Sequence, residues 1–226
     1  MHEYILLGIY WSSILFSVIM AFAHRSYLKG RRIQIFLPFL LLVFLQEIGL
    51  VIFKETTRLT EAEDIYKPIN FTYNFYKPLS VIVFAIVYYR VPFMEPFRKL
   101  ILFLTGAYFI INSINFIFFE PLFVSNTYLT FARNLLITCF ALFFLFRYFY
   151  LDNTGEEKFW QPLIWITIGV VIFYPVISIA VIFQKYLYTA EATVYGFKLY
   201  QLIPQVMSIF MYSCFSYAFY LCKKIN

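Results

Sequence analysis

The chain has 226 residues, of which 62% are hydrophobic and only 13% are charged. An ordinary soluble domain carries about twice that charged share. Aromatic residues reach 23%, with 30 Phe and 20 Tyr, and a single soluble core of this size cannot bury so much apolar side chain. The composition predicts an integral membrane protein and excludes a soluble enzyme, a nucleic-acid-binding domain and a disulfide scaffold.

The net charge is +6, from 18 Lys and Arg against 12 Asp and Glu. In a membrane protein this excess is typical of cytoplasmic loops that contact anionic lipid, not of nucleic-acid binding. Cys139, Cys214 and Cys222 lie in apolar stretches and are interpreted as buried free thiols. Because the two histidines, His2 and His24, lie outside the apolar runs, we expect no metal site and no cofactor.

Seven apolar runs are long enough to cross a bilayer. They cover residues 4–23, 33–53, 69–89, 98–119, 127–148, 160–184 and 197–222. The sequence therefore predicts an all-α fold, with residues 1–226 forming one transmembrane domain, a seven-helix bundle. Since the longest connection is residues 54–68, we expect no separate soluble domain, and the helices and short loops must carry the function.

Lys and Arg residues near the ends of the runs predict the orientation. With the N-terminus outside, the inner side carries Arg25, Lys29, Arg31, Arg32, Arg90, Arg98, Lys99, Arg147, Lys158, Lys223 and Lys224, and the outer side carries Lys54, Arg58, Lys67, Lys185 and Lys198. Basic loops stay preferentially in the cytoplasm, so the sequence predicts the N-terminus outside and the C-terminus inside. We expect a multi-pass protein of a bacterial inner membrane whose basic inner face contacts anionic lipid or a partner.

Three charged residues fall inside the apolar runs: Glu47, Lys77 and Arg133. A charge at such a position costs about 2.5–3.5 kcal/mol on insertion scales, so each of them asks for a reason. At about 1.5 Å per residue, each lies about 9–12 Å from the outer end of its run. The sequence thus predicts that three helices bring their charges to one depth in the outer half of the bundle.

Further polar side chains fall near the same depth. Asn70, Asn74 and Lys77 share one helical face, and the remaining residues of the layer are Asn112, Asn115, Asn134, Gln201, Gln205, Ser208 and Tyr212. Two interpretations remain open. The layer is either structural, joining helices through hydrogen bonds or through a Glu47–Lys77 or Glu47–Arg133 pair, or it forms a polar cavity open to the outer side.

For the cavity, the predicted ligand-binding residues are Glu47, Asn74, Lys77, Asn112, Asn115, Arg133, Gln201 and Gln205. Two positive charges against one negative charge favour an anionic group of a small anionic or amphipathic ligand, with Phe and Tyr lining the apolar part. No glycine-rich phosphate loop and no Gly-x-Ser-x-Gly motif is present, so no catalytic residue is predicted. An intramembrane lipid-modifying enzyme with Glu47 as acid or base is a third candidate.

Two stretches carry a resemblance: Glu157-Lys158-Phe159-Trp160 with Gly169 and Phe173-Tyr174, and Met207 through Tyr212 to Leu221-Cys222-Lys223-Lys224. They resemble a poorly characterised group of small bacterial seven-helix membrane proteins, often encoded near sensor histidine kinases. The resemblance implies a non-enzymatic sensory or accessory subunit that acts through a partner membrane protein such as a sensor kinase. The alternative is a small transporter or channel that uses the same polar layer as its substrate site.

Overall fold

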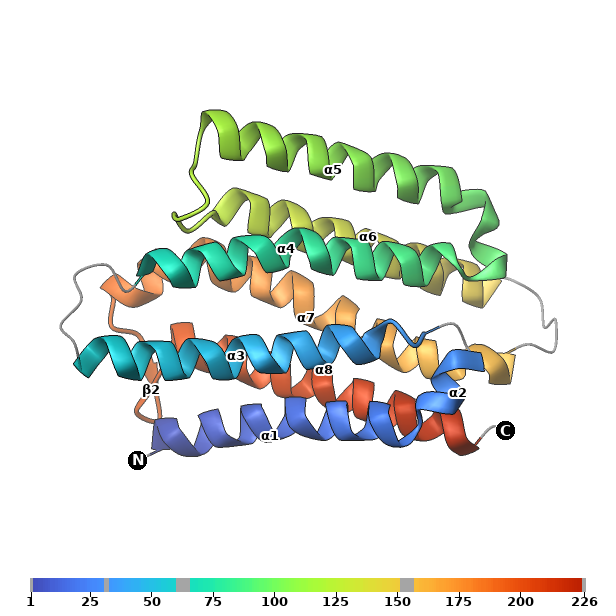
Figure 1. Cartoon of the computed structure of the whole chain (residues 1–226), viewed down its shortest axis with the longest axis horizontal. Helices are drawn as coiled ribbons and strands as arrows, with labels where there is room; N and C mark the ends of the chain where they lie inside the picture. Colours follow the sequence, from blue (N-terminus) through green and yellow to red (C-terminus); the bar gives the residue numbers. More distant parts are fainter. Residues whose placement is uncertain (1, 31–32, 60–65, 151–156, 225–226) are drawn as a thin grey trace.

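A computed structural model describes residues 2–30, 33–59, 66–150 and 157–224. The fold is all-α and 88% helical, with long helices lying side by side (Figure 1). In chain order, the elements are α1 (His2–Ala23), α2 (Arg25–Gly30), α3 (Phe36–Leu59), α4 (Tyr66–Tyr89), the 3-10 helix η1 (Pro92–Phe97), α5 (Arg98–Phe118), α6 (Thr127–Tyr150), α7 (Glu157–Thr189), β1 (Thr193–Val194), β2 (Phe197–Lys198) and α8 (Leu199–Lys224).

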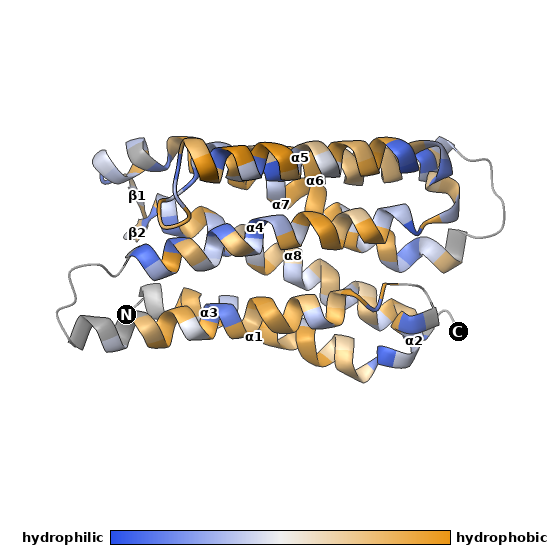
Figure 2. Ribbon diagram, turned by 45° about the horizontal axis from the view of Figure 1, so that its top comes forward, coloured by the Kyte–Doolittle hydropathy of each residue, from blue (hydrophilic) through white to orange (hydrophobic). Residues whose placement is uncertain are grey.

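Within the described ranges, six helical segments are long and apolar enough to cross a membrane. They are Ile5–Ala23, Phe36–Phe53, Pro92–Phe118, Thr127–Tyr150, Phe159–Gln184 and Leu199–Lys223. Apolar stretches run along these helices, and hydrophilic residues are more frequent toward their ends (Figure 2). The prediction of an all-α, multi-pass membrane protein is confirmed at this level.

The predicted apolar runs coincide with the long helices, and most of the differences lie at the helix ends. Helix α3 continues to Leu59 and α7 to Thr189, into segments that the sequence assigns to connections. Helix α4 does not meet the composition of a membrane span, although it has 24 residues, because polar residues crowd its first half. Arg31 and Arg32, which the sequence assigns to the inner side, lie outside the described residues.

Six of the helices form a closed ring. Each packs against the next in the order α1, α3, α4, α6, α7, α8, and α8 returns to α1. Helix α5 lies outside this ring and packs on α4, α6 and η1 (Figure 1). The N-terminus and the β1–β2 hairpin lie at one end of the bundle, and the C-terminus lies at the other (Figure 1).

Apolar and aromatic side chains fill the ring toward the end that carries the C-terminus. Phe36, Phe84, Tyr88, Phe144 and Phe215 are almost completely buried there. The rings of Phe36 and Phe84 meet edge-on and those of Phe36 and Phe215 are tilted, at centroid distances of 5.7 and 5.6 Å. Such contacts add to the stability that burial alone provides. This half of the ring is a packed core.

Small residues allow the closest helix contacts of the ring. Ser17 of α1 hydrogen-bonds Ser216 of α8 at 2.7 Å and donates to the carbonyl oxygen of Tyr212. Gly169 of α7 faces α8, and a Cβ atom at this position would lie 3.1 Å from the Cβ of Cys214. Because both ends of that contact are rigid, a side chain at Gly169 would push α7 and α8 apart.

We therefore expect Gly169→Leu to destabilise the protein by about 1–3 kcal/mol, the usual cost of overpacking a close contact. Gly106→Leu on α5 is the matched control, because nothing lies within 4 Å of a Cβ at that glycine. Melting temperatures of the two purified variants in detergent measure the difference. Equal melting temperatures would contradict the close α7–α8 contact.

Candidate ligand-binding cavity

A cavity of about 410 Å³ lies at the centre of the ring, toward the end that carries the N-terminus and the hairpin. Its wall comprises Tyr10, Val43, Gln46, Glu47, Ile69, Asn70, Tyr73, Asn74, Tyr76, Lys77, Ser125, Thr127, Thr130, Arg133, Phe173, Tyr174, Val181, Gln184, Ser208, Met211 and Tyr212. Every helix of the ring contributes to this wall. The volume is in the range of small-molecule sites, about 300–1,000 Å³.

Lys77 of α4 is one of two deeply buried cations in the wall, with 8% of its surface exposed. Its ammonium donates to Oδ1 of Asn74 at 2.8 Å and to the carbonyl oxygen of Asn126 at 3.0 Å. A lysine ammonium has three N–H groups. Within the described part of the chain, one of them remains for a group in the cavity.

The polar face of α4 also holds the connection between α5 and α6, residues 119–126. Asn74 donates to the carbonyl oxygens of Leu122 and Val124, both at 2.8 Å, and Asn70 donates to that of Phe123 at 3.1 Å. Buried or membrane-embedded carbonyl groups are costly without a donor, so these bonds fix the connection on α4. We call Asn70, Asn74 and Lys77 the α4 polar stripe.

Arg133 of α6 is the second buried cation, also 8% exposed. Its Nε and one Nη donate to Oδ1 of Asn134 at 2.9 and 2.6 Å, and its guanidinium lies 5.6 Å from the ring centre of Tyr174. Arginine has five N–H groups, so three are left for the cavity among the described residues. Lys77 lies within electrostatic range of Arg133, and the two like charges therefore share one side of the cavity.

Glu47 of α3 lies on a different part of the wall and is half-buried. Tyr73 donates its hydroxyl to Oε1 of Glu47 at 3.4 Å, and Tyr10 of α1 lies within electrostatic range of this carboxylate. The Glu47–Lys77 and Glu47–Arg133 pairs considered under the structural interpretation are not formed: in the described ranges, the hydrogen bonds of Lys77 and Arg133 go to amide and carbonyl oxygens. The α4 polar stripe directs Lys77 toward the connection and away from Glu47.

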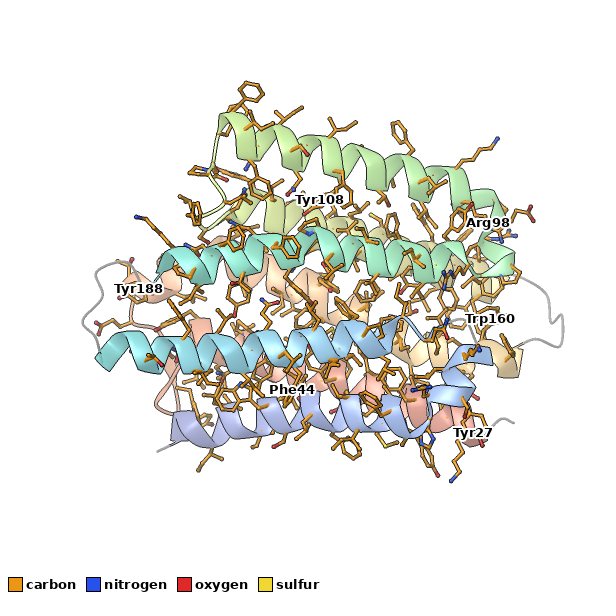
Figure 3. All side chains as sticks on the ribbon, in the orientation of Figure 1. Tyr27, Phe44, Arg98, Tyr108, Trp160 and Tyr188 are labelled. Carbon is orange, nitrogen blue, oxygen red and sulfur yellow. The ribbon has the colours of Figure 1, made fainter. Side chains whose placement is uncertain are left out.

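The structure corrects the prediction that Asn112 and Asn115 belong to this layer. Both are on α5, which lies outside the ring, and neither lines the cavity. Asn115 donates to Glu120 at 3.4 Å. Asn112 is 6% exposed, and within the described residues its Oδ1 has no hydrogen-bond partner. Tyr108, one turn before Asn112, lies between α5 and the ring (Figure 3).

The polar stripe of α8 lines the cavity only in part. Ser208 and Tyr212 belong to the wall, but the predicted residues Gln201 and Gln205 do not. Gln201 is exposed and donates to the hydroxyl of Tyr200 at 3.3 Å, and Gln205 is half-buried. The first turns of α8 therefore lie beyond the cavity, next to the hairpin that precedes the helix.

The prediction missed the contribution of α1 and α7. Tyr10 comes from α1, and Phe173, Tyr174 and Gln184 come from α7. Their signal in the sequence is weak because 23% of the chain is aromatic, so one more tyrosine in an apolar run does not stand out. Gln184, near the end of α7, also lines the cavity, and the predicted polar layer does not include it.

No family model, no curated protein and no solved structure matches this chain. Among the described residues, no group of three or more His, Cys, Asp and Glu side chains is arranged to hold a metal ion. The described residues place two buried cations and one carboxylate in the wall of an aromatic cavity.

We expect Asn74→Leu to release the connection, because it leaves two carbonyl oxygens without their donor and removes an acceptor from Lys77. The free energy of unfolding should fall by about 2 kcal/mol or more, and hydrogen exchange should rise in residues 119–126. Asn112→Leu is the matched control: it removes a buried amide oxygen that has no partner in the described chain and should not lower stability. Equal losses in the two variants would contradict this role of Asn74.

Proposed function

We propose that the chain is a seven-span membrane protein whose cavity binds a small ligand through an anionic group, and that it serves as a non-enzymatic sensory or accessory subunit. One observation carries the proposal: Lys77 and Arg133 are both buried in the wall of one cavity that six helices surround. No carboxylate forms an ion pair with either cation within the described residues.

The burial of Lys77 and Arg133 in one cavity wall has an energetic cost. Two like charges close together in a protein interior repel each other, and each also loses hydration. The bonds of Lys77 to Asn74 and Asn126 and of Arg133 to Asn134 hold the two side chains in place but do not cancel their like charges. An anionic group in the cavity would accept the N–H groups that remain on both side chains and reduce their repulsion. This supports a carboxylate or phosphate as the part of the ligand that is recognised.

The position of α4 supports seven spans. This helix lies in the ring between α3 and α6 and is as long as its neighbours. Its polar residues contact the connection and the cavity, so they do not need to face lipid, and a low hydropathy does not prevent this helix from spanning the membrane.

The basic residues of the described chain support an outward-facing cavity. Arg25, Lys29, Arg90, Arg98 and Arg147 lie at or near helix ends on the side opposite to the cavity, where Figure 3 labels Arg98. We propose that this side is cytoplasmic in a bacterial inner membrane and contacts anionic lipid there. The N-terminus, the hairpin and the cavity are then outside.

We propose that the response passes to a partner membrane protein such as a sensor kinase. The resemblance of residues 157–174 and 207–224 to small seven-helix proteins encoded near such kinases supports this partner. Between the long helices, the described residues form only the short helix α2, the 3-10 helix η1 and a hairpin of two two-residue strands. The effect of a ligand would therefore reach the partner through movement of the long helices.

The second candidate is a small transporter, and one observation favours it. Pro78, Pro175 and Pro204 interrupt the backbone hydrogen bonds of α4, α7 and α8, and the first two directly follow Lys77 and Tyr174 of the cavity wall. Interrupted helices at a central binding site are typical of transporters. Flux of a bound ligand in liposomes would favour transport, and binding without flux would favour sensing.

The proposed topology makes a direct prediction for cysteine labelling. In a variant without Cys139, Cys214 and Cys222, a membrane-impermeant thiol reagent applied to intact cells should label Ser125→Cys but not Glu95→Cys. Both positions are exposed, and they lie at opposite ends of α5. Labelling of Glu95→Cys from outside, with Ser125→Cys protected, would contradict the orientation.

Binding tests the proposed function. Small carboxylates and phosphates, added in turn to the purified protein, should include at least one that raises its melting temperature, and Arg133→Gln should weaken that binding about tenfold or more, the usual effect of losing a charged hydrogen bond. Arg98→Gln is the control, because Arg98 bonds the carbonyl oxygen of Tyr89 far from the cavity. If no such compound binds, or if both variants bind alike, the proposal is wrong.

A further inference from the structure

The charged groups of the cavity belong to two separate parts of its wall. Lys77 and Arg133, on α4 and α6, form what we call the cationic wall, and Glu47, with Tyr10 and Tyr73, forms the acidic wall. Tyr76 also lines the cavity and lies within electrostatic range of both Glu47 and Arg133. This division is a property of the folded chain that the composition of the layer does not reveal.

The cationic wall presents donors to an anion. After the bonds to Asn74, Asn126 and Asn134, one N–H of Lys77 and three of Arg133 remain among the described residues. The planar guanidinium, which lies over the ring of Tyr174, suits a carboxylate with its two coplanar oxygens.

The acidic wall presents the opposite chemistry. The hydroxyl of Tyr73 donates to Glu47 and holds the carboxylate in position, and Tyr10 lies within electrostatic range of the same carboxylate. Aromatic rings beside a carboxylate form the environment in which proteins bind ammonium groups, through charge attraction and cation–π contact. A ligand nitrogen is therefore the natural partner of this wall.

The two walls are farther apart than a direct ion pair, because within the described residues neither Lys77 nor Arg133 bonds Glu47. An α-amino acid carries its ammonium and carboxylate on one carbon atom, so its two charged groups cannot lie far enough apart to contact both walls well. A zwitterion with several carbon atoms between its charges fits this spacing better. Val43, Phe173 and Met211 supply apolar contacts for the carbon chain.

We propose that the ligand of this cavity is a zwitterion with separated charges, whose carboxylate binds Lys77 and Arg133 and whose ammonium binds Glu47. This inference rests on the proposed function and adds the class of ligand to it. The second charge also gives selectivity, since a ligand without the ammonium leaves the acidic wall unused, and one without the carboxylate leaves two cations unused.

A series of probes tests the inference on the purified full chain in detergent or nanodiscs. Glycine, β-alanine, 4-aminobutanoate and 6-aminohexanoate keep both charges and lengthen the chain between them. Hexanoate and hexylammonium keep one charge each. Titration calorimetry should show tighter binding for the longer zwitterions than for glycine, and a Kd for 6-aminohexanoate or 4-aminobutanoate about tenfold or more below that of hexanoate.

Variants of the acidic wall then test whether Glu47 binds the ammonium group of the ligand. Glu47→Gln, which keeps the shape of the side chain, should remove the advantage of the zwitterion over hexanoate while hexanoate binding persists. Tyr73→Phe should reduce the advantage, and it serves as the second variant if Glu47→Gln does not fold. Glu120→Gln is the matched control: Glu120 is a carboxylate within electrostatic range of Lys77 that does not line the cavity, and its loss should leave the preference unchanged.

The outcomes separate this inference from the proposed function. The zwitterion proposal is wrong, and a simple anion site remains, if any one of three results is found. Hexanoate binds as tightly as the zwitterions, glycine binds as tightly as the longer zwitterions, or the Glu47→Gln variant keeps the preference for the zwitterion. If none of the zwitterions and none of the carboxylates or phosphates binds, both proposals are wrong.

Discussion

Every polar group of a helix that lies in a membrane needs a partner inside the protein, and the rest of the structure depends on how α4 meets this constraint. Asn70, Asn74 and Lys77 meet it with the backbone carbonyl oxygens of residues 122–126. These bonds fix the α5–α6 connection on α4 and orient the polar face of α4 toward the centre of the ring. The same residues that hold the connection thereby become one wall of the cavity.

This arrangement accounts for both halves of the ring. Toward the C-terminal end, aromatic side chains such as Phe84 and Tyr88 are buried and pack into a core. Toward the other end, the polar groups of α4, α3 and α6 bond loop carbonyls, tyrosine hydroxyls and asparagine, and a cavity remains between them. Because those partners come from different elements, the charges stay apart. The proposed binding of a small charged ligand follows from this separation.

The fold could be predicted from the sequence because long apolar runs determine helices almost by themselves. The meeting of Glu47, Lys77 and Arg133 around one cavity was predicted correctly from the helical rise. The position of α5 was not, since an apolar helix has the same composition inside and outside a ring, and Asn112 and Asn115 were misassigned with it. The ion pairs considered under the structural interpretation are not formed, because Lys77 bonds a backbone carbonyl oxygen, which no residue pattern marks, and Arg133 bonds Asn134.

The central claim is that a water-accessible, positively charged cavity opens to the side of the N-terminus, and the reaction rate of a cysteine in its wall tests it most directly. Ser208 lines the cavity, while Ser216, two turns further along α8, is also buried but bonds Ser17 outside the cavity. In a chain without other cysteines, an anionic, membrane-impermeant thiol reagent applied from outside should modify Ser208→Cys and not Ser216→Cys. The reaction should slow when Arg133→Gln is added. Protection of both cysteines, or modification of Ser208→Cys only from the other side of the membrane, would contradict the account.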